Sequence, residues 1–346
     1  MIKVFKLSST DLRVLRAGHY RSILLAGSLS MFFAEVFAGS SPLWFVDLWA
    51  LTVTFPLYTM HLLFFFNLAY RFDRLSPRSL YLWGVLFGFY EFWITKVLWS
   101  GFIGESPLLG TFLGIAVFEF ILVALFWHPI MSFMLPILVI EILSLSYGQP
   151  SVPVPSHDRL LRKTRKNKLL AYYFVLNGAT ILAFNSSFNI LISHITAIGS
   201  IAIIVILIRI CRKTGIQINN ILLGKKGMII VSLYLALLYG IMFPLLLPER
   251  IPGLGTIIFT LLLYVVILLL IYCDKHTDTH DIDYMDTAET FEVADLKKYL
   301  VIFMALLTIF VLAPPVCIIM FMMIMFGDAI LGVGLFLRAI YDSIRT

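Results

Sequence analysis

An apolar and aromatic stretch between residues 80 and 141 contains ionisable side chains that could bind an ion or move a proton. An ionisable group at bilayer depth costs roughly 2.5–3.5 kcal/mol on insertion scales, so such groups normally face a protein interior or a wet cavity. Glu35, in the preceding apolar run, belongs with them. The candidate substrate- or ion-binding residues are Glu35, Glu91, Lys96, Glu119, His128 and Glu141.

Lys96 is the one basic residue that the sequence places deep inside an apolar span, predicted over residues 80–99. Glu91 lies five positions earlier, about 140° around an ideal helix, so the two side chains do not share a face. We therefore expect Lys96 to pair with an acid of another span, and Glu35, Glu119 and Glu141 are the choices. The group is either a substrate, proton or ion site, or a buried ion pair that fixes helix packing.

His128 and Pro129 interrupt the long apolar run over residues 108–145. If the chain folds back at this point, Glu119 and Glu141 lie on adjacent antiparallel segments. Two carboxylates and an imidazole would then converge, as a metal site or a proton relay requires. The alternative is an interfacial histidine at a helix turn, with the two glutamates in separate packing contacts.

An acidic segment over residues 274–295 is a second candidate site. His276, Asp278 and His280 interleave imidazoles with a carboxylate, a composition that could bind a divalent metal ion. The segment lacks the glycine and the ordered ligand positions of an EF-hand loop. A solvated loop, or docking onto the basic linker on the same side, would explain the charges equally well.

The elements that must position these residues are membrane helices. The chain has 346 residues, of which 60% are hydrophobic and 13% charged, against about 25% charged in soluble domains. Uncharged runs of about 20 residues recur, each long enough to cross a bilayer core. We predict an all-α, polytopic helical integral membrane protein with about nine to ten transmembrane helices.

The composition divides the chain into four parts. Residues 1–21 are a basic N-terminal segment for the cytoplasm or the membrane surface, and residues 22–146 are an aromatic, glutamate-containing half that we predict to be functional. Residues 147–168 form a linker that contains prolines and a dense basic cluster. Residues 169–346 are an Ile/Leu-rich half, which we expect to be more passive.

The positive-inside rule predicts a multi-pass protein of the cell membrane with a cytoplasmic N-terminus. It also places the basic segments over residues 71–78, 159–168 and 209–226 in the cytoplasm, where anionic lipid headgroups would contact them. This arrangement requires residues 108–145 to cross once. The alternatives are one crossing with a re-entrant segment near residue 128, or two crossings with the linker as an exception to the charge rule.

Three functions fit these observations. The first is a transporter or channel that uses the buried Lys/Glu/His cluster. The second is a non-catalytic subunit or assembly factor of a membrane complex, which would have partner proteins. The third is an intramembrane hydrolase that depends on a metal or on acid/base residues. No motif identifies a cofactor, and the basic residues lack the interleaved aromatics of a nucleic-acid-binding surface.

Overall fold

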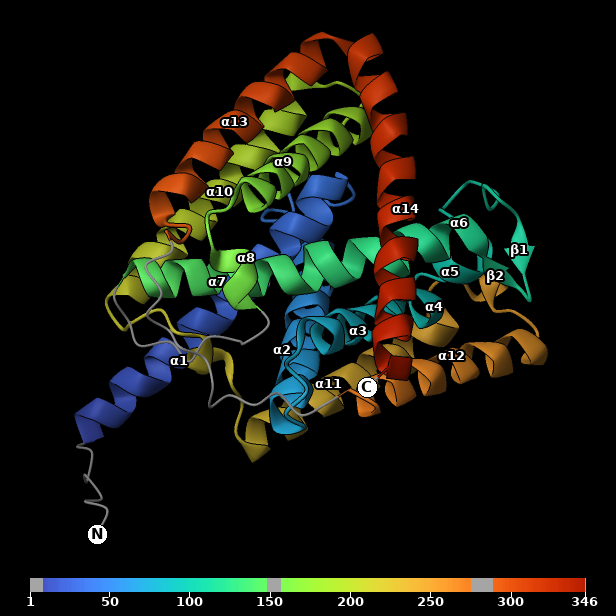
Figure 1. Cartoon of the computed structure of the whole chain (residues 1–346), viewed down its shortest axis with the longest axis horizontal. Helices are drawn as coiled ribbons and strands as arrows, with labels where there is room; N and C mark the ends of the chain where they lie inside the picture. Colours follow the sequence, from blue (N-terminus) through green and yellow to red (C-terminus); the bar gives the residue numbers. More distant parts are fainter. Residues whose placement is uncertain (1–8, 148–156, 275–288, 346) are drawn as a thin grey trace.

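The fold is all-helical apart from one short hairpin. The computed structural model describes residues 9–147, 157–274 and 289–345 (Figure 1). The hairpin pairs β1 (Thr111–Phe112) with β2 (Ile115–Ala116) in antiparallel register. The expected class of all-α integral membrane protein is confirmed.

The first half contains three helical segments before the hairpin. The first is α1 (Ser9–Met31), which continues as the π-helix η1 (Phe32–Val36). The second is η2 (Ala50–Thr54) with α2 (Phe55–Arg71). The third is broken into α3 (Pro77–Gly88), α4 (Tyr90–Trp93) and α5 (Val97–Ser100).

After the hairpin comes one long helix over residues 117–146. It consists of α6 (Val117–Glu119), the π-helix η3 (Phe120–Met134) and α7 (Leu135–Ser146). In the most apolar 18-residue stretch of this helix, 83% of the residues are buried inside the protein. The corresponding stretch of the peripheral helix α12 is 17% buried. This central helix is therefore the best buried of the six helices that could span a membrane.

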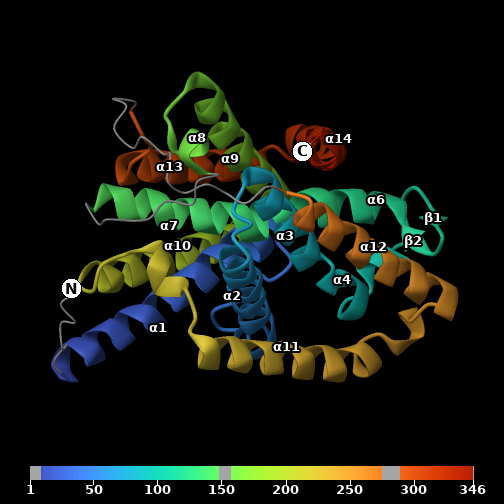
Figure 2. The same ribbon diagram turned by 60° about the horizontal axis from the view of Figure 1, so that its bottom comes forward.

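The second half surrounds the central helix. It comprises the short α8 (Asp158–Leu161) and six longer helices: α9 (Arg165–Asn185), α10 (Ile190–Arg212), α11 (Lys225–Leu245), α12 (Leu254–Tyr272), α13 (Val293–Leu312) and α14 (Pro314–Arg345). The 3₁₀ turns η5 (Ile218–Ile221) and η6 (Pro248–Arg250) lie in connections. In both overall views the central helix lies between the pair α9 and α13 and the pair α11 and α12 (Figures 1 and 2). Figure 2 shows α14 end-on while the central helix runs across the view, so these two helices cross steeply.

Six helices in the described part are long and apolar enough to span a membrane, fewer than the nine to ten predicted. Three other long helices, α1, α9 and α13, each begin with several charged residues, which lower the hydropathy of their first turns. The third predicted span, over residues 80–99, is not one helix, because the chain breaks near Lys96. The number of membrane spans thus depends on whether helices with polar ends and broken helices are counted.

The interruption predicted near residue 128 is wrong, because the helix continues through Pro129. Proline lacks the N–H that an α-helix needs and its ring crowds the preceding turn. The wider π-helical turns absorb this misfit. Residues 117–146 therefore form one continuous helix without a re-entrant loop.

Basic and acidic segments gather at one end of the molecule. Arg78 forms an ion pair with Asp274, and Arg71 donates to the Leu223 carbonyl at 2.8 Å. Lys163 lies 2.7 Å from Glu289 and 3.0 Å from Asp295. The hydrogen bonds that Lys163 donates to Glu289 and to Asp295 raise the pKa of its ammonium group above the usual value. The end of the acidic segment therefore docks onto the basic linker.

A second set of loops meets away from these charges. Arg250 donates to the carbonyls of Gly101 and Phe102, at 2.8 and 3.1 Å. Asn185 donates to the Ala38 carbonyl at 2.5 Å. Each of these contacts joins segments that lie far apart in the sequence.

Candidate functional site

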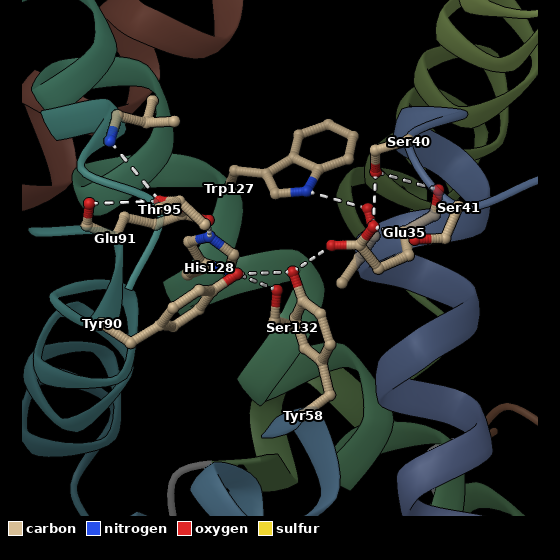
Figure 3. Close-up of polar contacts among 12 residues, drawn as sticks. Glu35, Ser40, Ser41, Tyr58, Tyr90, Glu91, Thr95, Trp127, His128 and Ser132 are labelled. Carbon is tan, nitrogen blue, oxygen red and sulfur yellow. Dashed lines mark hydrogen bonds and ion pairs between the residues drawn. The ribbon is translucent and has the colours of Figure 1, made fainter. Parts of the chain in front are cut away.

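Glu35 begins a buried network of polar side chains (Figure 3). The hydroxyls of Ser40 and Ser41 donate to its Oε2 at 2.6 and 2.7 Å, and the Tyr58 hydroxyl donates to Oε1. Gly39, with φ of +65°, turns the chain after the helix and allows the two serines to face back toward Glu35. The Tyr58 hydroxyl also lies 2.7 Å from the Tyr90 hydroxyl. Four hydroxyls are thereby linked to one carboxylate.

Glu91 and His128 form the inner part of this network. His128 Nε2 lies 3.1 Å from Glu91 Oε1, and His128 Nδ1 lies 2.8 Å from the Ser132 hydroxyl. The Thr95 hydroxyl donates to Glu91 Oε2. An ionised carboxylate can only accept, so Nε2 donates to Glu91 and leaves Nδ1 to accept from Ser132. The pair is thus a carboxylate and an imidazole in direct contact.

The two parts meet at the aromatic rings. The rings of Tyr90 and His128 pack edge to face with centroids 5.0 Å apart, and the rings of Tyr58 and His128 are 6.0 Å apart. His61 adds a branch: its ring centroid lies 5.3 Å from that of Tyr90, and its Nε2 lies 2.9 Å from the Tyr239 hydroxyl. Residues from the first-half helices and from α11 therefore pack around the rings of Tyr90 and His61.

Irregular backbone carries Glu35, Glu91 and His128. Glu35 lies in the π-helix η1 and His128 in the π-helix η3. Glu91 lies in the short α4, just before the break at Lys96, which has a φ of +58°. π-Helical turns and broken helices occur frequently at functional sites, because they redirect side chains and free backbone groups.

The network is most exposed at Ser40. Ser40 is exposed and Glu35 partly exposed, whereas Glu91 is 8% and His128 2% exposed. Tyr58 and Tyr90 between them are buried. The groups that follow Ser40 and Glu35 are therefore all buried, with Glu91 slightly more exposed than the two tyrosines.

Lys96 does not belong to this network, contrary to the expectation that it pairs with a glutamate. Its Nζ donates to the carbonyls of Met242 and Phe243, at 3.1 and 2.9 Å, and to that of Leu246. These carbonyls end α11, where the helix dipole favours a cation. Lys96 is a cap for another helix.

Glu119 and Glu141 also lie apart from His128, because the helix does not fold back. Glu119 Oε1 accepts from the Leu108 amide at 3.2 Å, and its Oε2 is buried without a hydrogen-bond partner in the described part. Glu141 pairs with the buried His157. The carboxylate partner of His128 is Glu91 instead.

Sequence reasoning missed several members of the network: Ser40, Ser41, Tyr58, His61, Tyr90, Thr95, Ser132 and Tyr239. The four-residue spacing of His128 and Ser132, and of Glu91 and Thr95, was the available signal, because such pairs share a helix face. The tyrosines gave no signal in a half that is rich in aromatic residues.

No three His, Cys, Asp or Glu side chains in the described ranges gather where they could hold a metal ion. The predicted ligands His276, Asp278 and His280 lie outside the described residues.

Residues 24–343 match the model of a family described as an uncharacterized membrane protein family. The chain belongs to this family. A segment of 118 residues is 42% identical to an uncharacterized protein of Archaeoglobus fulgidus, and the match covers 34% of this chain and 37% of that protein. No solved structure matches the chain. Family membership agrees with the membrane-spanning helices.

Proposed function

We propose that this protein is a membrane transporter that moves protons through the network of Glu35, Tyr58, Tyr90, His128 and Glu91. The observation that carries the proposal is that a partly exposed acid, Glu35, is linked through two buried phenols to a buried pair of imidazole and carboxylate. Intramembrane ionisable groups of this kind mark proton relays in pumps and transporters.

Each group can take up and release a proton in turn. Glu35 exchanges with the exposed end through Ser40 and Ser41, which touch its Oε2. The hydrogen-bonded hydroxyls of Tyr58 and Tyr90 carry the proton inward, each donating one proton as it accepts another. A rotation of the Tyr90 side chain would pass it to the pair of His128 and Glu91, since the rings of Tyr90 and His128 are in contact.

A transporter fits better than a channel. The described hydrogen bonds of Glu35, Tyr58 and Tyr90 lead to the end that contains Ser40. Those of Glu91, His128 and His61 stop at Thr95, Ser132 and Tyr239. A channel needs a path that is open to both sides, whereas a transporter opens its site to each side in turn. The broken segment of α4 and α5 next to Glu91 is the element we expect to move.

The test is proton flux into liposomes that contain the purified protein, driven by a potassium diffusion potential and read with an internal pH dye. We expect flux above that of empty liposomes, and a loss of at least tenfold in Glu91→Gln. Glu105→Gln, at an exposed loop position, is the matched control and should behave as the unmodified protein. Flux no faster than in empty liposomes, or unchanged flux in Glu91→Gln, would contradict the proposal.

The second candidate function is a non-catalytic subunit or assembly factor. The observation in its favour is that Lys96, Glu119 and Glu141 each contact a different partner outside the network. Such separate contacts stabilise helix packing and form no common site. It predicts that partner proteins co-purify with the chain and that the isolated chain carries no flux.

The hydrolase alternative has less support. One cavity of about 300 Å³ lies between Leu145 and Ala294, and another of about 410 Å³ lies beside Leu113 and Phe259. Neither is lined by a member of the network, so a substrate in either cavity would not meet Glu91 or His128.

We also propose that the charged end faces the cytoplasm of the cell, with the N-terminus on that side. The basic segments around Arg71, Arg78 and Lys163 gather there, as the positive-inside rule requires of cytoplasmic loops. Anionic lipid headgroups are the partners that we expect at this end.

A further inference from the structure

A second buried carboxylate lies in the half of the chain that the sequence suggested was passive. Asp328 on α14 has no exposed surface. Its Oδ2 accepts from Asn177 Nδ2 at 2.7 Å, and its Oδ1 accepts from the Tyr173 hydroxyl. Tyr173 and Asn177 are four residues apart on α9 and share one helix face. The site is separate from the network around His128.

When Asp328 is ionised, its charge has no protein counterpart in the described part of the chain. Its polar contacts there are with the neutral groups of Tyr173 and Asn177. The other helices packed against α14, which are η3, α12 and α13, contribute no ion pair to it within the described residues. Buried charges are normally paired or bound to metal ions, so this carboxylate calls for one positive charge.

An orphaned oxygen beside the carboxylate indicates what would supply that charge. Asn177 is fully buried, and its Oδ1 has no hydrogen-bond partner in the described residues. Both carboxylate oxygens already accept hydrogen bonds. A metal cation could contact Asp328 and the orphaned Asn177 oxygen together, whereas a proton on the carboxyl group would leave that oxygen unsatisfied.

We propose that Asp328, Asn177 and Tyr173 form a binding site for one monovalent alkali cation, sodium or potassium, in the second half of the protein. Carboxylate, amide and phenol oxygens are hard ligands that suit such cations. A single carboxylate matches one positive charge better than two. This inference does not depend on the proposed proton transport, because none of its residues belongs to that network.

The first experiment measures thermal unfolding of the purified full-length protein in detergent, in sodium or potassium chloride against choline chloride at equal ionic strength. A ligand that binds the folded state raises the melting temperature as its concentration rises. We expect a rise of several degrees that is specific to one alkali cation and is lost in Asp328→Asn and in Asn177→Leu. No difference from choline, or an equal rise in both variants, would overturn the proposal.

A second measurement needs no variant and therefore does not depend on how Asp328→Asn folds. A hydrophobic carbodiimide modifies protonated carboxyl groups in apolar surroundings, and mass spectrometry locates the product. We expect the alkali cation to protect Asp328 from modification at constant pH, with choline giving no protection. Modification that is equal in both salts would identify a protonated carboxyl group without a cation site and would overturn the proposal. Complete resistance to modification in choline would overturn it as well, since the emptied site should accept a proton.

Discussion

At the scale of single residues, surroundings decide what a buried charge does. Lys96 and Glu91 lie on the same broken segment, yet Lys96 faces the carbonyls at the end of α11 while Glu91 faces His128. Three carbonyls satisfy the three protons of the ammonium group. The lysine thus stabilises a helix end, and the glutamate has the geometry for proton exchange.

Substituting Lys96 should therefore affect stability more than function. In Lys96→Met the stem of the side chain is kept and the charged hydrogen bonds are lost, which should cost about 1.5–3 kcal/mol of unfolding free energy. Thermal unfolding in detergent measures this loss. Proton flux per folded molecule should stay within twofold of the unmodified protein. Loss of flux at unchanged stability would contradict this prediction and would show that Lys96 takes part in the function.

The sequence singled out Glu35, Glu91 and His128 as candidate site residues, and the structure places them in one network. It did not indicate that these three share a network through tyrosines, or that Lys96, Glu119 and Glu141 have other partners. Spacing along one helix determines which side chains share a face, but it does not determine which helices are neighbours. Asp328 shows the same limit, because its partners lie on α9, more than a hundred residues earlier.

At the scale of elements, the contact between α3 and η3 holds the pair Glu91 and His128 in place. A Cβ atom added at Gly84 would lie 2.6 Å from the Pro129 Cα, and one added at Gly88 would lie 3.1 Å from the His128 Cβ. Such distances leave no space for a side chain at Gly84. The two glycines therefore let α3 approach the π-helix at the residues that form the site.

Gly84→Ala should separate these two elements. Overpacking of this kind costs about 1–3 kcal/mol, so we expect a lower melting temperature and reduced proton flux. Gly334→Ala on α14 is the matched control, because nothing lies within 4 Å of a Cβ at that position. Its melting temperature should be equal or slightly higher, since alanine favours helix more than glycine. Equal stability of the two variants would show that the contact is looser than described.

The irregular elements explain why local patterns predicted the wrong break. Pro129 was the strongest helix-breaking signal, yet the helix continues through it in π form. The actual break is at Lys96, whose positive φ is unusual for a residue other than glycine. Contacts with α11 fix that conformation, and they are tertiary contacts that a local pattern does not contain.

At the scale of the whole molecule, the charged segments bear on which loops lie on the same side of the membrane. Ion pairs and hydrogen bonds place Arg78, Asp274, Lys163 and Glu289 in the charged set of loops. A single helix over residues 117–146 allows the linker to lie on the same side as the loop near Arg78, which removes the conflict between two crossings and the charge rule. The hydropathy pattern predicted the membrane class, but tertiary contacts were needed for this arrangement.

Cysteine labelling tests the orientation. Cys273 is exposed and adjoins the charged end, whereas Cys211 and Cys317 are buried. Glu105→Cys places a second thiol on the exposed loop near Gly101. In intact cells an impermeant maleimide should label Glu105→Cys and spare Cys273, and permeabilised cells should show both. Labelling of Cys273 in intact cells would reverse the proposed orientation.

The measurement that tests the central claim most directly is proton flux in liposomes that contain Tyr58→Phe or Tyr264→Phe. Both tyrosines are packed among aromatic residues, and each substitution removes one hydroxyl. Tyr58 joins Glu35 to Tyr90, whereas Tyr264 accepts from Trp93 outside the network. The proposed path predicts at least a tenfold loss of flux in Tyr58→Phe and flux close to that of the unmodified protein in Tyr264→Phe. Equal flux in the two variants would contradict the path through Tyr58.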